Sequence, residues 1–146
     1  MPETLARLSS IESETKRVGL VANAISTGIV RLLAEYTGRG PTKARTYIHD
    51  DSVVVVLADT LTKSERRLIA AGEDKLVLNT RSAFQEAMKY ELIAVVEECT
   101  GRKVNAFLSA NTVQPDYGTE TFILAPDQAK LSLAQLDNAT LGQSDQ

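Results

Sequence analysis

The densest group of polar side chains in this sequence is a basic stretch at residues 38–45, Gly38-Arg39-Gly40-Pro41-Thr42-Lys43-Ala44-Arg45. Its two glycines let backbone N–H groups turn toward a ligand, and its three cations can neutralise an anion. It is not a Walker A motif, because it lacks Gly-Lys-Ser/Thr. We therefore take Arg39, Gly40, Lys43 and Arg45 as candidate residues for binding phosphate, nucleotide or bicarbonate. The alternative is structural, since cations that follow a helix complement the negative end of its dipole.

The other reactive side chains do not form a catalytic or metal-binding motif. A divalent cation takes oxygen ligands, which four aspartates offer without EF-hand spacing: Asp50, Asp51, Asp59 and Asp116. His49 is the single histidine and Cys99 the single cysteine, which excludes a disulfide framework and a Cys/His zinc site. We interpret His49 as a structural or surface residue and Cys99 as a small buried hydrophobe. Because no nucleophile–base pair is evident, we expect a protein that is not an enzyme and needs no cofactor or metal.

Composition and charge limit the class of protein further. The chain has 146 residues, 43% of them hydrophobic and 24% charged, which is typical of one compact soluble domain. Sixteen Lys and Arg stand against nineteen Asp and Glu, a net charge of -3, so we expect no partner among nucleic acids. The start, Met1-Pro2-Glu3, lacks signal-peptide features, and no run of about 18 apolar residues occurs. These features predict a cytoplasmic protein without direct membrane insertion.

Apolar residues at helical spacing predict a long first helix over residues 10–37, roughly 40 Å in length. One row recurs every seven positions: Ile11, Val18, Ile25 and Leu32. Ser9 and Glu12 have the spacing of a capping box at its start, and Gly38 fits its end.

This apolar stripe is longer than one small sheet can cover, since it extends over about 27 residues. Small residues at Ala22, Ser26 and Gly28 would let a second helix come close. We therefore expect a homo-oligomer, most simply a C₂ dimer.

The remaining chain is expected to form strands and two further helices. Period-two alternation and turn residues predict strands at residues 44–50, 52–58, 104–109 and 119–124. Thr62 and Glu65 have the spacing of a capping box and open a short helix, and a longer helix follows and ends at Gly101. Residues 111–118 read as a loop rich in turn formers, and residues 127–146 as a polar tail that is a frayed helix or disordered.

The two halves of the chain share a pattern. Glu35-Tyr36-Thr37-Gly38-Arg39 and Glu98-Cys99-Thr100-Gly101-Arg102 each end a long helix and precede a strand pair. We infer a pseudo-duplicated αββ-αββ arrangement over residues 1–126, of the α+β class. Its four strands form one mostly antiparallel sheet packed with the long helices.

The sequence also resembles the small bacterial MpsC family. In the first half the resemblance rests on residues 32–48, on Asp50-Asp51 and the valine run to Leu57, and on Asp59-Thr60-Leu61-Thr62 with Glu65. In the second half it rests on Arg81, Phe84-Gln85, Ala87, Val96-Glu97-Glu98, Thr100-Gly101-Arg102, Val104, Ala106-Phe107-Leu108-Ser109 and Pro115-Asp116. It covers residues 15–126. Ala110 and Gln114 depart from the family pattern, in which aspartates are expected, and this weakens any metal site built on that loop.

The resemblance implies a link to membrane systems that generate sodium gradients or supply inorganic carbon. Without a transmembrane segment the chain would be an accessory or regulatory component, with a membrane transport protein as an expected partner. Two functional classes stay open. The first is a non-enzymatic, self-associating regulator, and the second is an enzyme that uses the basic loop on a small anion or nucleotide.

Overall fold

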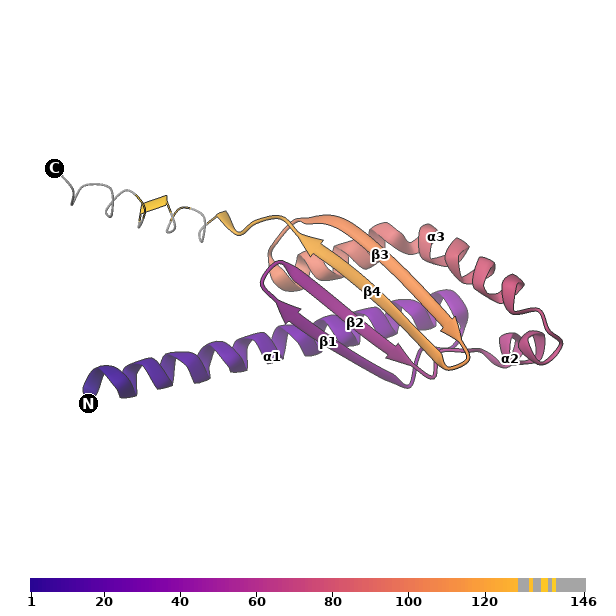
Figure 1. Cartoon of the computed structure of the whole chain (residues 1–146), viewed down its shortest axis with the longest axis horizontal. Coiled ribbons are helices and arrows are strands. Elements are labelled where there is room, and N and C mark those ends of the chain that lie inside the picture. The colour runs from indigo at the N-terminus through magenta and orange to yellow at the C-terminus, as the bar shows by residue number, and fades with distance from the viewer. Residues whose placement is uncertain (129–131, 133–134, 137, 139–146) are drawn as a thin grey trace.

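The chain folds into a four-stranded antiparallel sheet with two long helices on one face. The computed structural model describes residues 1–128, 132, 135–136 and 138. The elements, in chain order, are α1 (Pro2–Thr37), β1 (Lys43–His49), β2 (Ser52–Ala58), α2 (Lys63–Ala70), α3 (Asp74–Thr100), β3 (Val104–Val113) and β4 (Asp116–Leu124). The strand order is β1-β2-β4-β3, and α1 and α3 lie behind the sheet in Figure 1. The predicted α+β class is confirmed.

The pseudo-duplication and the bounds of the domain stay predictions. A helix and a hairpin occur twice in the order that an αββ repeat requires, but duplication of one ancestral unit stays an inference, as does the domain over residues 1–126. The predicted polar tail, residues 127–146, lies largely outside the described residues.

Alternation along the strands places one set of side chains in the core. β1 and β2 pair antiparallel with Thr46 opposite Val55, as the period-two pattern predicts. Val55 is fully buried, and so is Phe122 of β4. The rings of Phe107 and Phe122 pack at 5.2 Å between centroids, a distance typical of favourable aromatic pairs. The two hairpins therefore share one sheet and one core, as expected.

α1 begins earlier than the sequence predicts. It starts at Pro2, and Ser9 and Glu12 lie inside it, so the predicted capping box is wrong. Proline fits the first helical turn because the N–H it lacks would have no helical partner there. The predicted end is confirmed, since Gly38 is left-handed with φ of 78°, a conformation that glycine adopts without steric penalty.

The two halves of α1 have different environments. Ile25 and Ile29 in the second half are fully buried against the sheet and α3. Residues 1–17 are all exposed, and Figure 1 shows this half extending beyond the sheet. The apolar stripe is thus covered at one end and bare at the other.

By length and composition, α1 is the one helix among the described residues that is apolar enough to cross a membrane, with a mean hydropathy of 1.4 over its best 18-residue window. Helices that pack in the core of soluble proteins also meet this criterion. Insertion would withdraw Ile25 and Ile29 from the core. The expected lack of direct membrane insertion stays a prediction.

α1 and α3 approach closely at a glycine. A Cβ atom on Gly28 would lie 2.7 Å from Cγ1 of Val95, which is closer than real Cβ contacts allow. The hydroxyl of Ser26, on α1, shares a hydrogen bond of 2.7 Å with the hydroxyl of Thr46 on β1. Both small residues are therefore used inside the protomer, and the expected close approach at Gly28 is to the chain's own α3.

The second hairpin is longer than predicted. β3 extends to Val113 and β4 begins at Asp116, so the prediction of a loop at residues 111–118 is wrong except for Gln114-Pro115. Asn111 pairs with Gly118 in the ladder. Turn preference is a local tendency, and ladder hydrogen bonds outweigh it here. By contrast, the predicted capping box of Thr62 and Glu65 at the start of α2 is confirmed.

Candidate functional site

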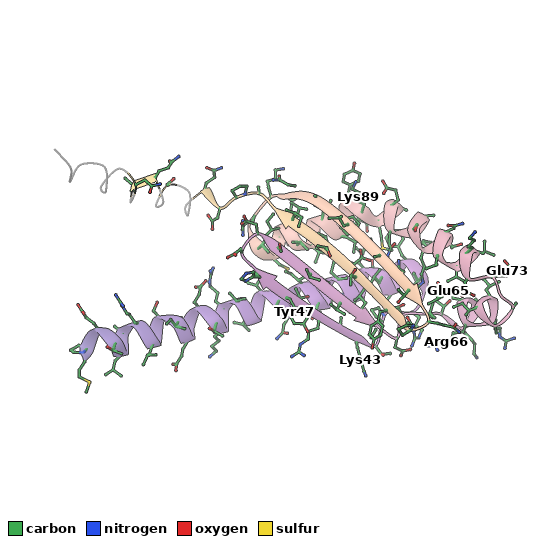
Figure 2. The ribbon with its side chains drawn as sticks, viewed as in Figure 1. Lys43, Tyr47, Glu65, Arg66, Glu73 and Lys89 are labelled. Atoms are coloured by element: carbon green, nitrogen blue, oxygen red, sulfur yellow. The ribbon has the colours of Figure 1, made fainter. Side chains whose placement is uncertain are left out.

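A network of ion pairs lies at the end of the sheet where α2 begins (Figure 2). The carboxylate of Asp59, just after β2, accepts hydrogen bonds from Thr42 Oγ1 at 2.7 Å, Arg39 Nη2 at 2.9 Å and Arg66 Nη2 at 2.7 Å. The Thr42 hydrogen bond lowers the pKa of Asp59 and burial raises it. The two arginines lower it again, and the net direction is down.

Asp116, at the start of β4, holds the segment that follows Asp59. It accepts hydrogen bonds from the backbone N–H groups of Thr60 and Leu61, both at 3.1 Å, and from the Thr60 hydroxyl at 2.7 Å. Burial raises the pKa of Asp116, but these bonds and the Arg81 charge lower it more. The turn between β3 and β4 is thereby tied to the chain that enters α2.

Arg81 of α3 completes the network. Its Nε donates to Glu65 Oε2 at 2.6 Å and its Nη2 to Glu65 Oε1 at 3.0 Å. Nη1 and Nη2 also donate to the hydroxyl and the carbonyl of Thr60. Burial raises the pKa of Glu65, but Arg81 and the Thr62 cap lower it more. The Arg81 and Glu65 side chains are only 15% and 17% exposed, so this pair is largely removed from water.

A cavity of about 210 Å³ opens beside this network, between α1, α3 and the sheet. Its apolar wall comprises Leu33, Tyr36, Pro41, Leu57, Phe84 and Met88. Polar side chains of α3, β3 and β4 face the same space, among them Arg81, Gln85, Asn111 and Glu120. A mostly apolar hollow with a few convergent polar groups is typical of a small-molecule site.

Glu120 is the most unusual of these side chains, because it is a carboxylate with 1% exposure. Its Oε1 accepts from Gln85 Nε2 at 3.1 Å, while Oε2 is buried without a hydrogen-bond partner among the described residues. Burial raises the pKa of Glu120 to about 7, although Ser109 and Gln85 act to lower it. Ser109 lies directly opposite on β3, but its buried hydroxyl is not in the geometry of a regular hydrogen bond.

A chain of side-chain hydrogen bonds leads from Arg81 to Glu120. Arg81 Nη1 lies 3.4 Å from Asn111 Oδ1, Asn111 Nδ2 donates to Gln85 Oε1 at 3.0 Å, and Gln85 donates to Glu120. Every donor in this chain points toward the carboxylate. The aligned amides therefore favour negative charge on Glu120, against the cost of burial.

Two of the four residues proposed for anion binding have structural partners. Arg39 donates to Asp59 and to the carbonyls of Asp59 and Leu61. Gly40 packs against α1, where an added Cβ would lie 3.1 Å from the carbonyl oxygen of Val30. The structure therefore uses both residues to hold the loop.

The other two residues lie apart from Arg39, on the strand that follows. Lys43 and Arg45 are exposed on β1, on the sheet face that the helices leave uncovered, and Figure 2 shows Lys43 and Tyr47 along this edge. The Arg45 guanidinium lies 5.9 Å from the centre of the Tyr47 ring. Anion binding by the four predicted residues stays a prediction. Of the four, Lys43 and Arg45 are the exposed residues that could meet an anion.

The structure also separates the four aspartates. Asp59 and Asp116 are bound to the network above, whereas Asp50 and Asp51 lie in the turn at the far end of the first hairpin. His49 is exposed beside Asp50 at that end. Burial, followed by the charge of Glu98, raises the pKa of Cys99, as expected for a residue that packs against the core.

The polar cavity residues Arg81, Gln85 and Glu120 were not among the candidate site residues predicted from the sequence. A signal for Glu120 was present, because it alternates with the inward-facing Phe122 and Leu124 along β4. Arg81 and Gln85 are spaced by four residues and share one face of α3. What the sequence did not show is that these two faces meet.

The fold and the cavity define a small α+β domain with a buried acidic residue and an unpaired helix extension. The chain belongs to the MpsC family, since the family described as "Na+-translocating membrane potential-generating system (MpsC)" matches residues 17–126. The resemblance seen in the sequence is thereby confirmed, and the family description suggests a role in a sodium-translocating system that generates membrane potential. Comparisons with curated proteins and with solved structures give no significant match.

Proposed function

We propose that this protein is a non-enzymatic, cytoplasmic accessory or regulatory component of a membrane ion-gradient or inorganic-carbon uptake system, and that it acts as a homodimer. The family description supports the link to a membrane system. A non-enzymatic role is supported by the position of the single histidine. His49 lies exposed at the end of β1, beside the turn, whereas the Arg81–Glu65 pair lies near the opposite end of the first hairpin.

The bare half of α1 is the observation that supports self-association. Leu8 and Ile11 are 52% and 61% exposed, and their spacing continues the stripe that buries Ile25 and Ile29 further along the helix. An exposed apolar stripe on a helix that projects from the domain is typical of an interface. A second copy of the chain can cover it with the same stripe.

The charges beside the stripe favour an antiparallel pairing of two α1 helices. If Leu8 of one protomer packs against Ile11 of its partner, the two-fold axis passes between residues 9 and 10. In this register Arg7 of one protomer flanks Glu14 of the other, and the same contact occurs twice. Residues 3–17 contain three acidic and three basic residues, so this segment is neutral and suits a copy of itself better than an anionic membrane surface.

A charge exchange across this interface tests both the association and its direction. We expect sedimentation of the wild type at tens of micromolar to give a dimer mass. Ile11→Asp should give a monomer, because it places a charge in the apolar seam. Arg7→Glu should shift the mass toward the monomer, and Arg7→Glu combined with Glu14→Arg should restore the dimer.

The sedimentation results distinguish the antiparallel α1 interface from other arrangements of the dimer. Lys89→Glu, a charge reversal on α3 away from α1, serves as the matched control and should leave the mass unchanged. A monomeric wild type would overturn self-association. A mass that stays unchanged in Ile11→Asp, or a double variant that is no better than Arg7→Glu, would contradict the antiparallel α1 pairing.

A further inference from the structure

Glu120, which lines the cavity beside α3, has one carboxylate oxygen that the fold leaves without a partner. Oε2 of Glu120 is buried and has no hydrogen-bond partner among the described residues, although nearly all buried polar groups in proteins have one. Glu120 lines the cavity together with apolar side chains such as Leu57, Phe84 and Met88. The missing partner is therefore expected to come from a molecule that occupies this space.

The charges around the cavity indicate the sign of that molecule. Arg39 is paired with Asp59 and Arg81 with Glu65, so these two cations are already neutralised. Ionised Glu120 then leaves one uncompensated negative charge. A carboxylate that is removed from water is stabilised when a cation or a strong donor reaches it.

The size and lining of the cavity indicate the rest of the ligand. Its volume is about 210 Å³, whereas an apolar cavity of about 150 Å³ is enough to hold benzene. One ring or a short branched chain with a one-carbon extension would fill it. Aromatic and thioether side chains, Phe84 and Met88, suit such a body.

We propose that this cavity binds a small monocation that joins an apolar body to one ammonium group, with the ammonium on the Glu120 carboxylate. This site lies away from the bare half of α1, so it does not depend on the proposed dimer. It would give a regulatory component a ligand to sense.

The two methionines of the chain allow a direct test with benzylamine as the probe. Met88 lines the cavity and Met1 is 98% exposed at the N-terminus. In protein with ¹³C-labelled methionine methyl groups, benzylamine should shift the Met88 resonance and leave that of Met1 in place. Benzyl alcohol, which has the same shape without the charge, should bind at least tenfold more weakly, and benzoate should not bind.

Glu120→Gln and a pH series identify the carboxylate as the recognition group. The variant should bind benzylamine no better than benzyl alcohol, while Glu86→Gln, the same change at an exposed site on α3, should behave as wild type. In wild type the affinity for benzylamine should rise about tenfold from pH 6 to pH 8, because Glu120 ionises near pH 7. Over this range arginine stays protonated, and the lowered pKa of Glu65 keeps that residue ionised.

Three results would overturn the proposal. The first is a Met88 resonance that none of the probes shifts. The second is benzoate binding as tightly as benzylamine. The third is a benzylamine affinity that changes neither with pH nor, in a folded variant, with Glu120→Gln. The pH series needs only wild-type protein, so the test does not depend on the stability of the variant.

Discussion

Replacing Arg81 with methionine is expected to lower the free energy of unfolding by about 3 kcal/mol, the lower end of the range for breaking a buried ion pair, because the Arg81–Glu65 pair is partly buried. The substitution removes the ion-pair partner of Glu65, whose side chain is 17% exposed. It also removes the donors to the hydroxyl and the carbonyl oxygen of Thr60. Methionine preserves much of the aliphatic volume, so the loss comes mainly from the carboxylate that is left without a cation. Urea denaturation at one fixed protein concentration measures it.

A matched control lies in the same network. Arg66 also binds a carboxylate, that of Asp59, but it is 53% exposed, so Arg66→Met should cost no more than about 1 kcal/mol. Adding Glu65→Gln to Arg81→Met should recover part of the loss, because glutamine keeps the capping box and removes the unpaired charge. Equal effects of Arg81→Met and Arg66→Met would show that the buried pair does not stabilise the fold as described.

Replacing Glu120 with glutamine is expected to change how stability depends on pH. Burial raises the pKa of Glu120 from 4.5 to about 7, so the folded state binds this proton more tightly than the unfolded state does. Its contribution to stability is fully present below about pH 4.5 and is lost as the pH rises through 7. The size of this contribution is about 3 kcal/mol, from about 1.4 kcal/mol for each pKa unit.

The difference between variant and wild type isolates this group. Asp59, Glu65 and Asp116 have lowered pKa values and lose stability in the opposite direction, as the pH falls, but they are present in both proteins and cancel. The free energy of unfolding of Glu120→Gln minus that of wild type should therefore rise by about 3 kcal/mol between pH 4.5 and pH 8. A difference that is flat with pH would mean that Glu120 is not a buried acid in the folded protein.

Local patterns were enough to predict the elements whose signals are local. Thr62 and Glu65 cap α2, and Gly38 and Gly101 end the long helices, because a cap depends on three or four adjacent residues. The first hairpin followed from alternation, since side-chain direction in a strand has a period of two. The Ser9 cap failed because the helix continues through it: serine favours a cap only where a helix begins.

The cavity was not predictable in the same way, because its residues come from distant parts of the chain. Gln85 and Glu120 are 35 positions apart and meet only because β4 lies in the middle of the sheet, beside β3, on which α3 packs. The basic stretch at residues 38–45 was the site that the sequence predicted, yet Arg39 in this stretch forms an ion pair with Asp59. Glu120, which has one carboxylate oxygen without a partner among the described residues, stands in a segment that reads as an ordinary strand.

We propose that this protein serves a membrane ion-gradient system as an accessory that acts as a dimer. Membrane potential, measured with a voltage-sensitive dye in sodium medium, tests it most directly in cells of the source organism that lack the gene. We expect the potential to fall without the gene, to be restored by the wild type and by the Arg7→Glu/Glu14→Arg double variant, and not to be restored by Ile11→Asp at equal expression. A potential that is unchanged by loss of the gene, or one that Ile11→Asp restores fully, would contradict the proposed role of the dimer.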